Sequence, residues 1–358
     1  MNFDYNGPPI KVIQVGLGGF GRSWAQLAHQ TTGLAMTGAV DPFPAAREWA
    51  ARELDGRLPL FESLSTALPA VESDAVLVIT PPPTHHAIVS EALRAGKHVL
   101  VEKPLAMSLS EADELIALAD RVGRILMVSQ NYRYRAPLRA VQRFVVSERL
   151  GDLIAVNAEF RRHTQTLFGE GNFRYQMKHP LVLDMSIHHF DMLRAITGKN
   201  VVSVDARSWK APGTWYQHDP AATALMELEG GIPFTYQGDW APRHSVLDTS
   251  WNADWTIRGE LGTLVWIGDI DNAFMGRVKF ESNDGDCSEI ELPRLDAIDR
   301  EGSLRAFWAA VVTNTEPETS AKDNIHSLAV VLAAIVSIER REAVSIAGMR
   351  EDVAKQRQ

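Results

Sequence analysis

The sequence contains almost no cysteine and no long hydrophobic run. Cys287 is the single cysteine among 358 residues, which excludes an internal disulfide bond and a cysteine-rich zinc site. The N-terminal residues MNFDYNGPP contain neither the basic start nor the apolar stretch of an export signal. The most apolar run, residues 328–336, is shorter than the roughly 18 residues that span a membrane. We therefore expect a cytoplasmic protein that has no membrane partner and no bound metal.

Positive charge is also scarce. The chain has 36 Lys and Arg against 45 Asp and Glu, and its net charge of -9 comes without any cluster of basic residues. Proteins that bind nucleic acid show such clusters, so we expect no nucleic-acid partner. There is no internal repeat or low-complexity tract, and the hydrophobic content of 45% is typical of a globular protein. A chain of this length predicts two domains.

Glycine is concentrated in one stretch that follows a short apolar run, residues 10–15. The sequence GLGGFG then leads into a helix-compatible segment. In a G-x-G-x-x-G turn the first glycine allows the tight turn, the second lets a pyrophosphate approach the backbone, and the third lets the helix pack on its strand. The helix N-terminus offers N–H groups to the phosphates. The spacing predicts a dinucleotide site at Gly16, Gly18, Gly19, Phe20 and Gly21.

An acidic residue supports this interpretation. Asp41 ends the next apolar run, 20 residues after Gly21, where a carboxylate accepts hydrogen bonds from both ribose hydroxyls. The 2′-phosphate of NADP would meet its negative charge, so Asp41 favours NAD. Arg47, about one helical turn further on, leaves NADP possible.

The pattern of segments predicts two architectures. In residues 1–130, strands that are continuous apolar runs alternate with helices, which is typical of a parallel sheet covered on both faces. We predict a doubly wound Rossmann fold with strands at 10–15, 35–40, 75–79, 98–101 and 125–128, and helices at 20–30, 43–54, 85–95 and 110–122. In residues 131–358 we predict an α/β substrate-binding domain on a large, mostly antiparallel sheet. Its strands are expected near 153–160, 201–209, 222–229, 233–240, 251–258, 263–267 and 277–281, and its helices at 137–147, 180–197, 302–313 and 323–340.

Ligands of doubly wound sheets collect at the carboxyl ends of the strands. Residues 80–86 (TPPPTHH) follow one predicted strand, and Thr84 also suits a helix N-cap there. Lys103, in Glu102-Lys103-Pro104, follows the next predicted strand, residues 98–101. Beside a nicotinamide this lysine would hold a substrate oxygen or assist proton transfer, although a solvated lysine is the default for this residue type.

The predicted helix over residues 180–197 is apolar on most sides, yet Asp184, His188 and Asp191 fall at i, i+4 and i+7 on one stripe. Buried polar groups are costly unless they are paired or used. The spacing is compatible with a catalytic site and equally with an Asp184–His188 pair that faces solvent.

The segments GLGGFGR, TPPPTHH, AGKHVLVEKPLA and QNYRYRAPL, at these separations, resemble the glucose–fructose oxidoreductase/inositol dehydrogenase/rhizopine catabolism (Gfo/Idh/MocA) family of NAD(P)-dependent oxidoreductases. The resemblance implies a Rossmann domain joined to an open antiparallel-sheet domain, and a homodimer or homotetramer. It implies a catalytic Lys103, often followed by a cis proline bond, with Asp184 and His188 as its catalytic partners. The expected cofactor-binding residues are Gly16, Gly18, Gly19, Phe20, Gly21, Asp41, Thr80, Pro81, Pro82, His85, Glu102 and Lys103.

One departure from the family pattern concerns the pocket. The family usually has paired glycines shortly before the aspartate and often a glycine two residues after it. Here the corresponding residues are Lys178-His179-Pro180 and Ser186. The family's substrates therefore carry over poorly to this chain.

The expected reaction is hydride transfer between nicotinamide and a secondary alcohol or carbonyl of a sugar or polyol. His188 would be the general base, Asp184 would orient it or bind a substrate hydroxyl, and Lys103 would stabilise the alkoxide. Polar candidates for the substrate pocket are Arg133, His163 and Tyr236, with the Arg161-Arg162 pair as a further possibility. The alternatives are a keto-sugar or imine reductase and an NAD(P)-binding sensor with an idle site, against which the intact catalytic set argues.

Overall fold

The structure of the protein is a computed structural model that describes residues 7–242 and 248–355. The chain forms two compact units. Unit 1 contains Met1–Asn131 and Asp296–Ile325, and unit 2 contains Tyr132–Leu295 and His326–Gln358. The sequence predicts a single domain boundary at residue 130. In the structure the first unit ends nearby, at Asn131, but residues 296–325 also belong to it.

Unit 1 is built on a six-stranded sheet with the order β3-β2-β1-β4-β5-β6, and all its strand pairs are parallel. This confirms the predicted doubly wound fold. The central strands are buried along almost their whole length, which explains their continuous apolar sequences. The strands are β1 (Ile10–Val15), β2 (Leu34–Val40), β3 (Leu60–Phe61), β4 (Ala75–Val78), β5 (His98–Glu102) and β6 (Leu126–Ser129).

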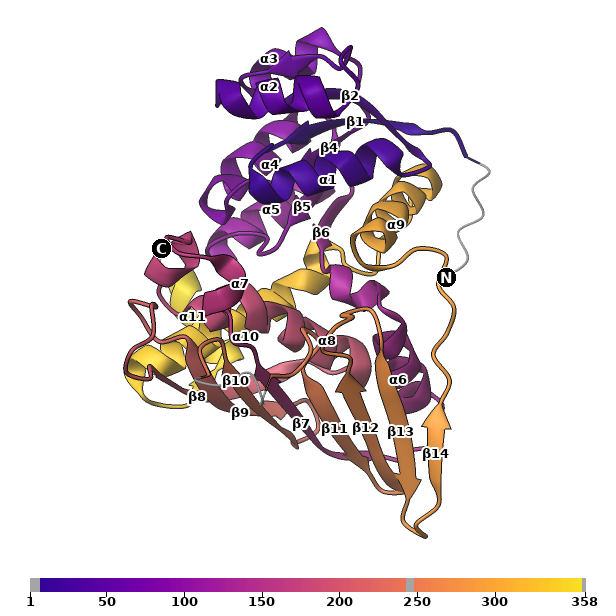
Figure 1. Ribbon diagram of the computed structural model, residues 1–358, viewed down its shortest axis with the longest axis vertical. Coiled ribbons are helices and arrows are strands. Elements are labelled where there is room, and N and C mark those ends of the chain that lie inside the picture. Colours follow the sequence, from indigo (N-terminus) through magenta and orange to yellow (C-terminus); the bar gives the residue numbers. More distant parts are fainter. Residues whose placement is uncertain (1–6, 243–247, 356–358) are drawn as a thin grey trace. The chain divides into compact units, whose positions relative to one another are not determined.

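Helices cover this sheet in the order that the alternating pattern predicts (Figure 1). A helix from the far end of the sequence joins them, because α9 packs against α1 and β6. The sequence pattern gave no indication of β3 and α3, since β3 has only two residues and α3 contains Pro69. The helices of unit 1 are α1 (Gly19–Gln30), α2 (Pro44–Glu53), α3 (Leu64–Ala70), α4 (His85–Arg94), α5 (Leu109–Val122) and α9 (Asp299–Thr313).

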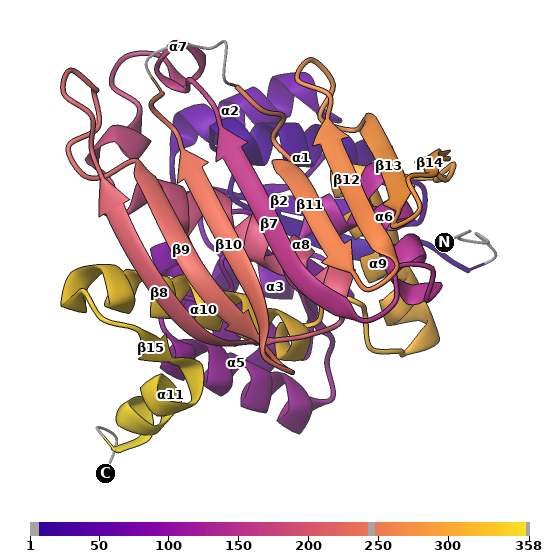
Figure 2. The ribbon, with the colours of Figure 1, turned by 90° about the horizontal axis from the view of Figure 1, so that it is seen from below.

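Unit 2 contains a nine-stranded sheet with the order β14-β13-β12-β11-β7-β10-β9-β8-β15 (Figure 2). Its pairs are antiparallel except for the parallel pair β7–β10, so the predicted, mostly antiparallel sheet is confirmed. Burial alternates along β9 and β10, because one face packs on the helical layer. The strands are β7 (Leu153–Arg161), β8 (Val201–Trp209), β9 (Ala221–Leu228), β10 (Ile232–Asp239), β11 (Asp254–Gly259), β12 (Gly262–Gly268), β13 (Gly276–Ser282), β14 (Cys287–Ile290) and β15 (Val344–Ser345).

The helices of unit 2 include α6 (Ala136–Val146), α7 (Gln165–Phe168), α8 (Ile187–Thr197) and α11 (Ile346–Lys355). The helix α10 (Ala321–Arg340) begins in unit 1 and continues into unit 2. By length and composition alone, with a mean hydropathy of 1.4, α10 is apolar enough to cross a membrane. Because 61% of its most apolar window is buried in the structure, α10 has the character of a core helix.

Candidate functional site

The glycine loop lies between β1 and α1, and its glycines serve two purposes. Gly16 has a φ of +100°, and a Cβ there would lie 2.2 Å from the carbonyl oxygen of Ile79. A Cβ at Gly21 would lie 2.4 Å from the oxygen of Gly16. These two glycines are required by the packing of strand, turn and helix. At Gly18 and Gly19, in contrast, a Cβ would meet nothing within 4 Å.

The open space above Gly18 and Gly19 lies where α1 begins. The first turn of α1 has no side-chain cap and no acidic residue, so its N–H groups are available to an anion. Phe20 is 57% exposed beside them. These residues fit the pyrophosphate of a dinucleotide, because backbone donors and space coincide.

Asp41 follows β2 and faces the same loop. It is buried, and its carboxylate accepts the backbone N–H of Leu17 at 2.8 Å and that of Phe43 at 2.9 Å. A carboxylate has about four acceptor positions, so capacity for ribose hydroxyls is left. Arg47 donates to the carbonyl oxygens of Asp41 and Pro42 at 2.7 and 3.0 Å. The arginine is therefore engaged with backbone oxygens and with the neighbouring Glu62 carboxylate.

The residues Thr80–His85 leave the carboxyl end of β4 and are tied to the loop after β5. The buried ring of His85 places Nδ1 2.8 Å from the oxygen of Pro104 and Nε2 2.9 Å from the oxygen of Thr80. Burial lowers the pKa of His85. Thr84 stands at the N-cap position of α4, as expected, but its hydroxyl donates to the Pro81 oxygen at 2.8 Å and makes no capping hydrogen bond to the helix. Pro82 begins the 3₁₀ turn that precedes α4.

Glu102, Lys103 and Pro104 follow at the carboxyl end of β5. The Lys103–Pro104 peptide bond is cis. Glu102 is buried, and this burial raises the pKa of its carboxyl group to about 7, against the opposing effects of the Lys103 charge and backbone N–H. Lys103 thus stands next to a carboxyl group that titrates near neutral pH.

In unit 2, His188 lies in the first turn of α8 and is held by an aromatic stack. Its ring is parallel to that of Tyr132 within 8°, at a centroid distance of 4.1 Å. The guanidinium carbon of Arg135 lies 3.2 Å from the same Tyr132 centroid. At these distances the two groups cannot share one face of the phenol ring, so they lie on opposite faces. Arg135 is itself fixed by a 2.6 Å hydrogen bond to Asn252.

Asp184 lies in a π-helical turn, Leu181–Ser186, that precedes α8. Such a turn is wider than the α-helical turn that the i, i+4 spacing to His188 assumes. The Asp184 carboxylate accepts a hydrogen bond from Nε of Arg174 at 2.5 Å. Arg174 was not predictable from the sequence, because an arginine ten residues before an aspartate gives no periodic pattern.

The other polar residues predicted for the pocket are occupied within unit 2. Arg133 forms a buried, bidentate ion pair with Asp191, with both N–O distances 2.7 Å. The hydroxyl of Tyr236 accepts a hydrogen bond from Ser186 at 3.0 Å and is buried, which raises its pKa. The half-buried His163 ring places Nδ1 2.6 Å from the oxygen of Pro242.

The backbone at His179 explains how the chain replaces the glycines before Asp184. His179 has a φ of +47°, in the left-handed region that glycine adopts without strain. A side chain there costs about 1–2 kcal/mol. The ring Nε2 lies 3.6 Å from the carboxylate of Glu339, an ion pair when the histidine is protonated. The turn typical of a glycine is therefore kept with a histidine.

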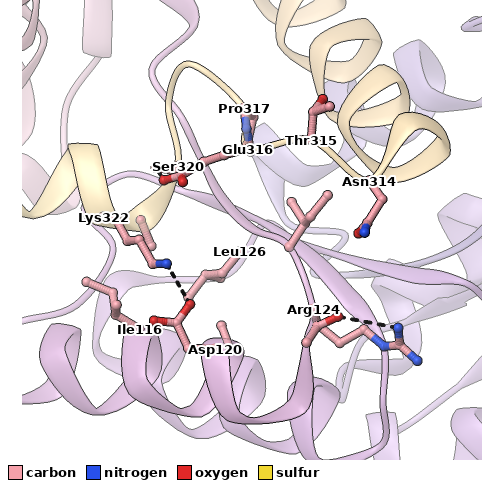
Figure 3. Close-up of a pocket in the computed structure, with 14 residues that line it drawn as sticks. Ile116, Asp120, Arg124, Leu126, Asn314, Thr315, Glu316, Pro317, Ser320 and Lys322 are labelled. Atoms are coloured by element: carbon pink, nitrogen blue, oxygen red, sulfur yellow. Dashed lines mark hydrogen bonds and ion pairs between the residues drawn. The ribbon is translucent and has the colours of Figure 1, made fainter.

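Two further features concern metal ligands and a surface cavity of unit 1. Within residues 7–242 and 248–355, no group of three or more His, Cys, Asp or Glu is placed to hold a metal ion. A cavity of about 270 Å³ lies between α5 and residues 314–322, where Lys322 contacts Asp120 at 2.7 Å (Figure 3). Its lining includes Ile125 and Leu126, at the amino end of β6, so it lies at the sheet edge opposite the glycine loop.

The parallel sheet, its glycine loop and Asp41 are the features of a dinucleotide-binding Rossmann domain. Residues 10–130 match the family described as "Oxidoreductase family, NAD-binding Rossmann fold". Residues 138–265 match the "GFO/IDH/MocA C-terminal domain". The chain belongs to the Gfo/Idh/MocA family of oxidoreductases, and its cofactor is NAD.

Several known proteins are similar over nearly the whole chain. D-apiose dehydrogenase of Paraburkholderia graminis is 25% identical, with 96% of this chain and 91% of the relative covered. Inositol 2-dehydrogenase of Rhizobium meliloti is 24% identical, with coverages of 93% and 98%. The crystal structure of an oxidoreductase from Agrobacterium radiobacter in complex with NAD+, L-tartaric acid and magnesium has a TM-score of 0.83 and 20% identity, covering 95% of this chain and 99% of that one.

Proposed function

We propose that this protein is an NAD-dependent dehydrogenase that oxidises a secondary alcohol of a sugar, a polyol or a sugar derivative. The observation that carries the proposal is the placement of Lys103 at the same strand edge as the open glycine loop. A cation there suits a developing alkoxide next to the nicotinamide. The names of the two relatives, an apiose and an inositol dehydrogenase, support the CH–OH chemistry.

In the proposed mechanism NAD, when bound, accepts the hydride. His188 takes the hydroxyl proton, because an imidazole titrates near neutral pH. Its stack on Tyr132 restricts the ring to one plane. Asp184 orients the substrate through a neighbouring hydroxyl or favours the charged imidazole, and Lys103 donates a hydrogen bond to the alkoxide oxygen.

We also propose that NAD is preferred over NADP. The buried carboxylate of Asp41 would repel a 2′-phosphate, and Arg47 is held by Glu62 and by backbone oxygens. Titration of the protein with each reduced cofactor, followed by nicotinamide fluorescence, tests this preference. Tighter binding of NADPH than of NADH would overturn it.

A cofactor-reduction screen over polyols, aldoses and sugar acids tests the activity itself. With an active substrate, His188→Ala should reduce kcat by about 100-fold or more and leave the Kd for NAD nearly unchanged. Unchanged turnover in this variant would refute the assignment of His188. A protein that binds NAD but oxidises none of these compounds, and that does not reduce keto-sugars or imines with NADH, would be a sensor.

We further propose a cytoplasmic homodimer or homotetramer. The face of the large sheet away from the helices carries exposed apolar side chains on several strands, including Val202, Leu225 and Ile267. We expect a second copy to cover this open face, as the family resemblance implies. Light scattering coupled to size-exclusion chromatography measures the assembly, and a monomer at micromolar concentration would contradict it.

A further inference from the structure

Asp184, one of the proposed catalytic residues, has a cationic neighbour that its own helix does not supply. Arg174 lies in the 3₁₀ turn Phe173–Gln176, and its Nε donates to Asp184 Oδ2 at 2.5 Å. The two side chains are 26% and 19% exposed, so the pair is accessible to a small molecule. Neither the binding of NAD nor the roles proposed for His188 and Lys103 require Arg174.

Most of the hydrogen-bonding capacity of Arg174 remains available. A guanidinium group has five N–H donors, and the bond to Asp184 uses one of them. Among the residues that the structure describes, none accepts a hydrogen bond from the two terminal nitrogens. These nitrogens present parallel N–H groups, the arrangement that a carboxylate binds with both of its oxygens.

The guanidinium is also held in place before any ligand arrives. The ring centroids of Phe168 and Phe173 lie 4.8 and 4.6 Å from its central carbon. The turn is fixed by the Asn172 side chain, which accepts the backbone N–H of Arg174 at 3.1 Å. A donor group that is already oriented loses less entropy when it binds.

We propose that Arg174 binds the carboxylate of an acidic sugar, such as an aldonate or a uronate, and makes it a better substrate than its neutral counterpart. This inference rests on the proposed dehydrogenase function. The carboxylate takes no part in the electron balance. Hydride leaves the carbinol carbon for NAD, the hydroxyl proton passes to His188, and the product is a keto acid.

The choice of a carboxylate follows from the donor set. Arginine has only hydrogen-bond donors. It therefore suits a ligand carboxylate, which only accepts, better than a ligand hydroxyl, whose own proton also needs an acceptor. Hydrogen bonds to charged groups are about twice as strong as neutral ones. Because Asp184 already offsets part of the charge, we expect a preference of about 10- to 100-fold and not more.

The experiment compares kcat/KM for matched pairs that share one carbon skeleton, such as a hexitol and the corresponding aldonate. Arg174→Met and Arg174→Lys are measured beside the wild type. The control is Arg207→Met, which removes an arginine of the same unit that also pairs with an aspartate, Asp205. Loss of the Asp184 contact affects both members of a pair, so the acid-to-neutral ratio isolates the carboxylate contact.

We expect the wild type and Arg207→Met to prefer the acid, Arg174→Met to lose the preference, and Arg174→Lys to keep part of it. In thermal unfolding without cofactor, the aldonate should raise the Tm of the wild type and not that of Arg174→Met. A wild-type preference for the polyol, or an equal ratio in Arg174→Met, overturns the inference while the dehydrogenase function stands. If no pair is oxidised and His188→Ala changes nothing, the proposed function itself has failed.

Discussion

Glu102 provides a quantitative test of the electrostatics next to Lys103. The Glu102→Gln substitution removes the carboxyl group's ability to ionise and keeps its shape. The side chain is only 7% exposed, and its pKa is raised from 4.5 to about 7 because burial penalises the charged form. The neutral amide has no such pH-dependent penalty.

The sign and the size of the effect follow from the two pKa values. Between pH 4.5 and about 7 the folded protein keeps a proton that the unfolded chain has lost, so the free energy of unfolding falls as the pH rises through this window. The difference between about 7 and 4.5 is about 2.5 pH units. At 1.36 kcal/mol per unit the loss amounts to about 3 kcal/mol.

The assay is urea-induced unfolding of the cofactor-free protein at about pH 5 and about pH 8. Relative to the wild type, Glu102→Gln should gain about 2–3 kcal/mol more at the higher pH than at the lower one. The exposed Glu48, replaced in the same way, is the control and should show no such difference. If Glu102→Gln and the wild type lose stability in parallel as the pH rises, Glu102 is ionised when folded and the reasoning is refuted.

Three further predictions concern other positions. Gly16→Ala should unfold at a markedly lower temperature than the wild type, because its Cβ would lie 2.2 Å from the Ile79 oxygen. Gly18→Ala should keep the wild-type Tm, because a Cβ there meets nothing within 4 Å, but should weaken NAD binding at least 10-fold. Unchanged NAD affinity in Gly18→Ala would contradict the proposal that the pyrophosphate lies in the open space above Gly18. Arg133→Met should lower the free energy of unfolding by about 3 kcal/mol, since the buried Asp191 carboxylate loses its bidentate partner and keeps Ser327 at 2.8 Å and the more distant Arg194 at 3.9 Å. A change below about 1 kcal/mol would speak against this pair. Tyr132→Leu should reduce kcat at least 10-fold with the Kd for NAD unchanged, whereas Tyr132→Phe, which preserves the stack on His188, should restore most of it.

The sequence predicted the parts of the fold whose patterns are local. Strand β8 spans Val201–Trp209, the range that the alternating pattern predicts, and the strands of unit 1 are continuous apolar runs. Short or exposed elements such as β14, which begins at Cys287, lack such a pattern. The helix α9 was expected, but not its return to unit 1, because an apolar face indicates that a helix is buried and not which sheet it packs against.

The same distinction applies to the site. The positions of the loops proposed to bind the cofactor were predictable, because the carboxyl ends of parallel strands lie at one edge of a sheet and the sequence shows which residues follow each strand. Arg174 and the stack of Tyr132 between His188 and Arg135 depend on contacts between distant segments. Periodicity carries no information about such contacts. Arg133 and Tyr236 were polar residues near the expected pocket, and their partners, Asp191 and Ser186, became apparent only in three dimensions.

The two departures from the family's glycine pattern acquire a physical meaning in this structure. His179 adopts the left-handed backbone that a glycine would supply, and its ring faces the Glu339 carboxylate. Ser186, where the family often has a glycine two residues after the aspartate, donates a hydrogen bond to Tyr236 of β10. Both residues therefore anchor the ends of the π-helical turn that carries Asp184. Because these residues fix the turn without the glycines typical of the family, the substrate is better inferred from the Arg174–Asp184 pair that the turn presents than from the substrates of relatives.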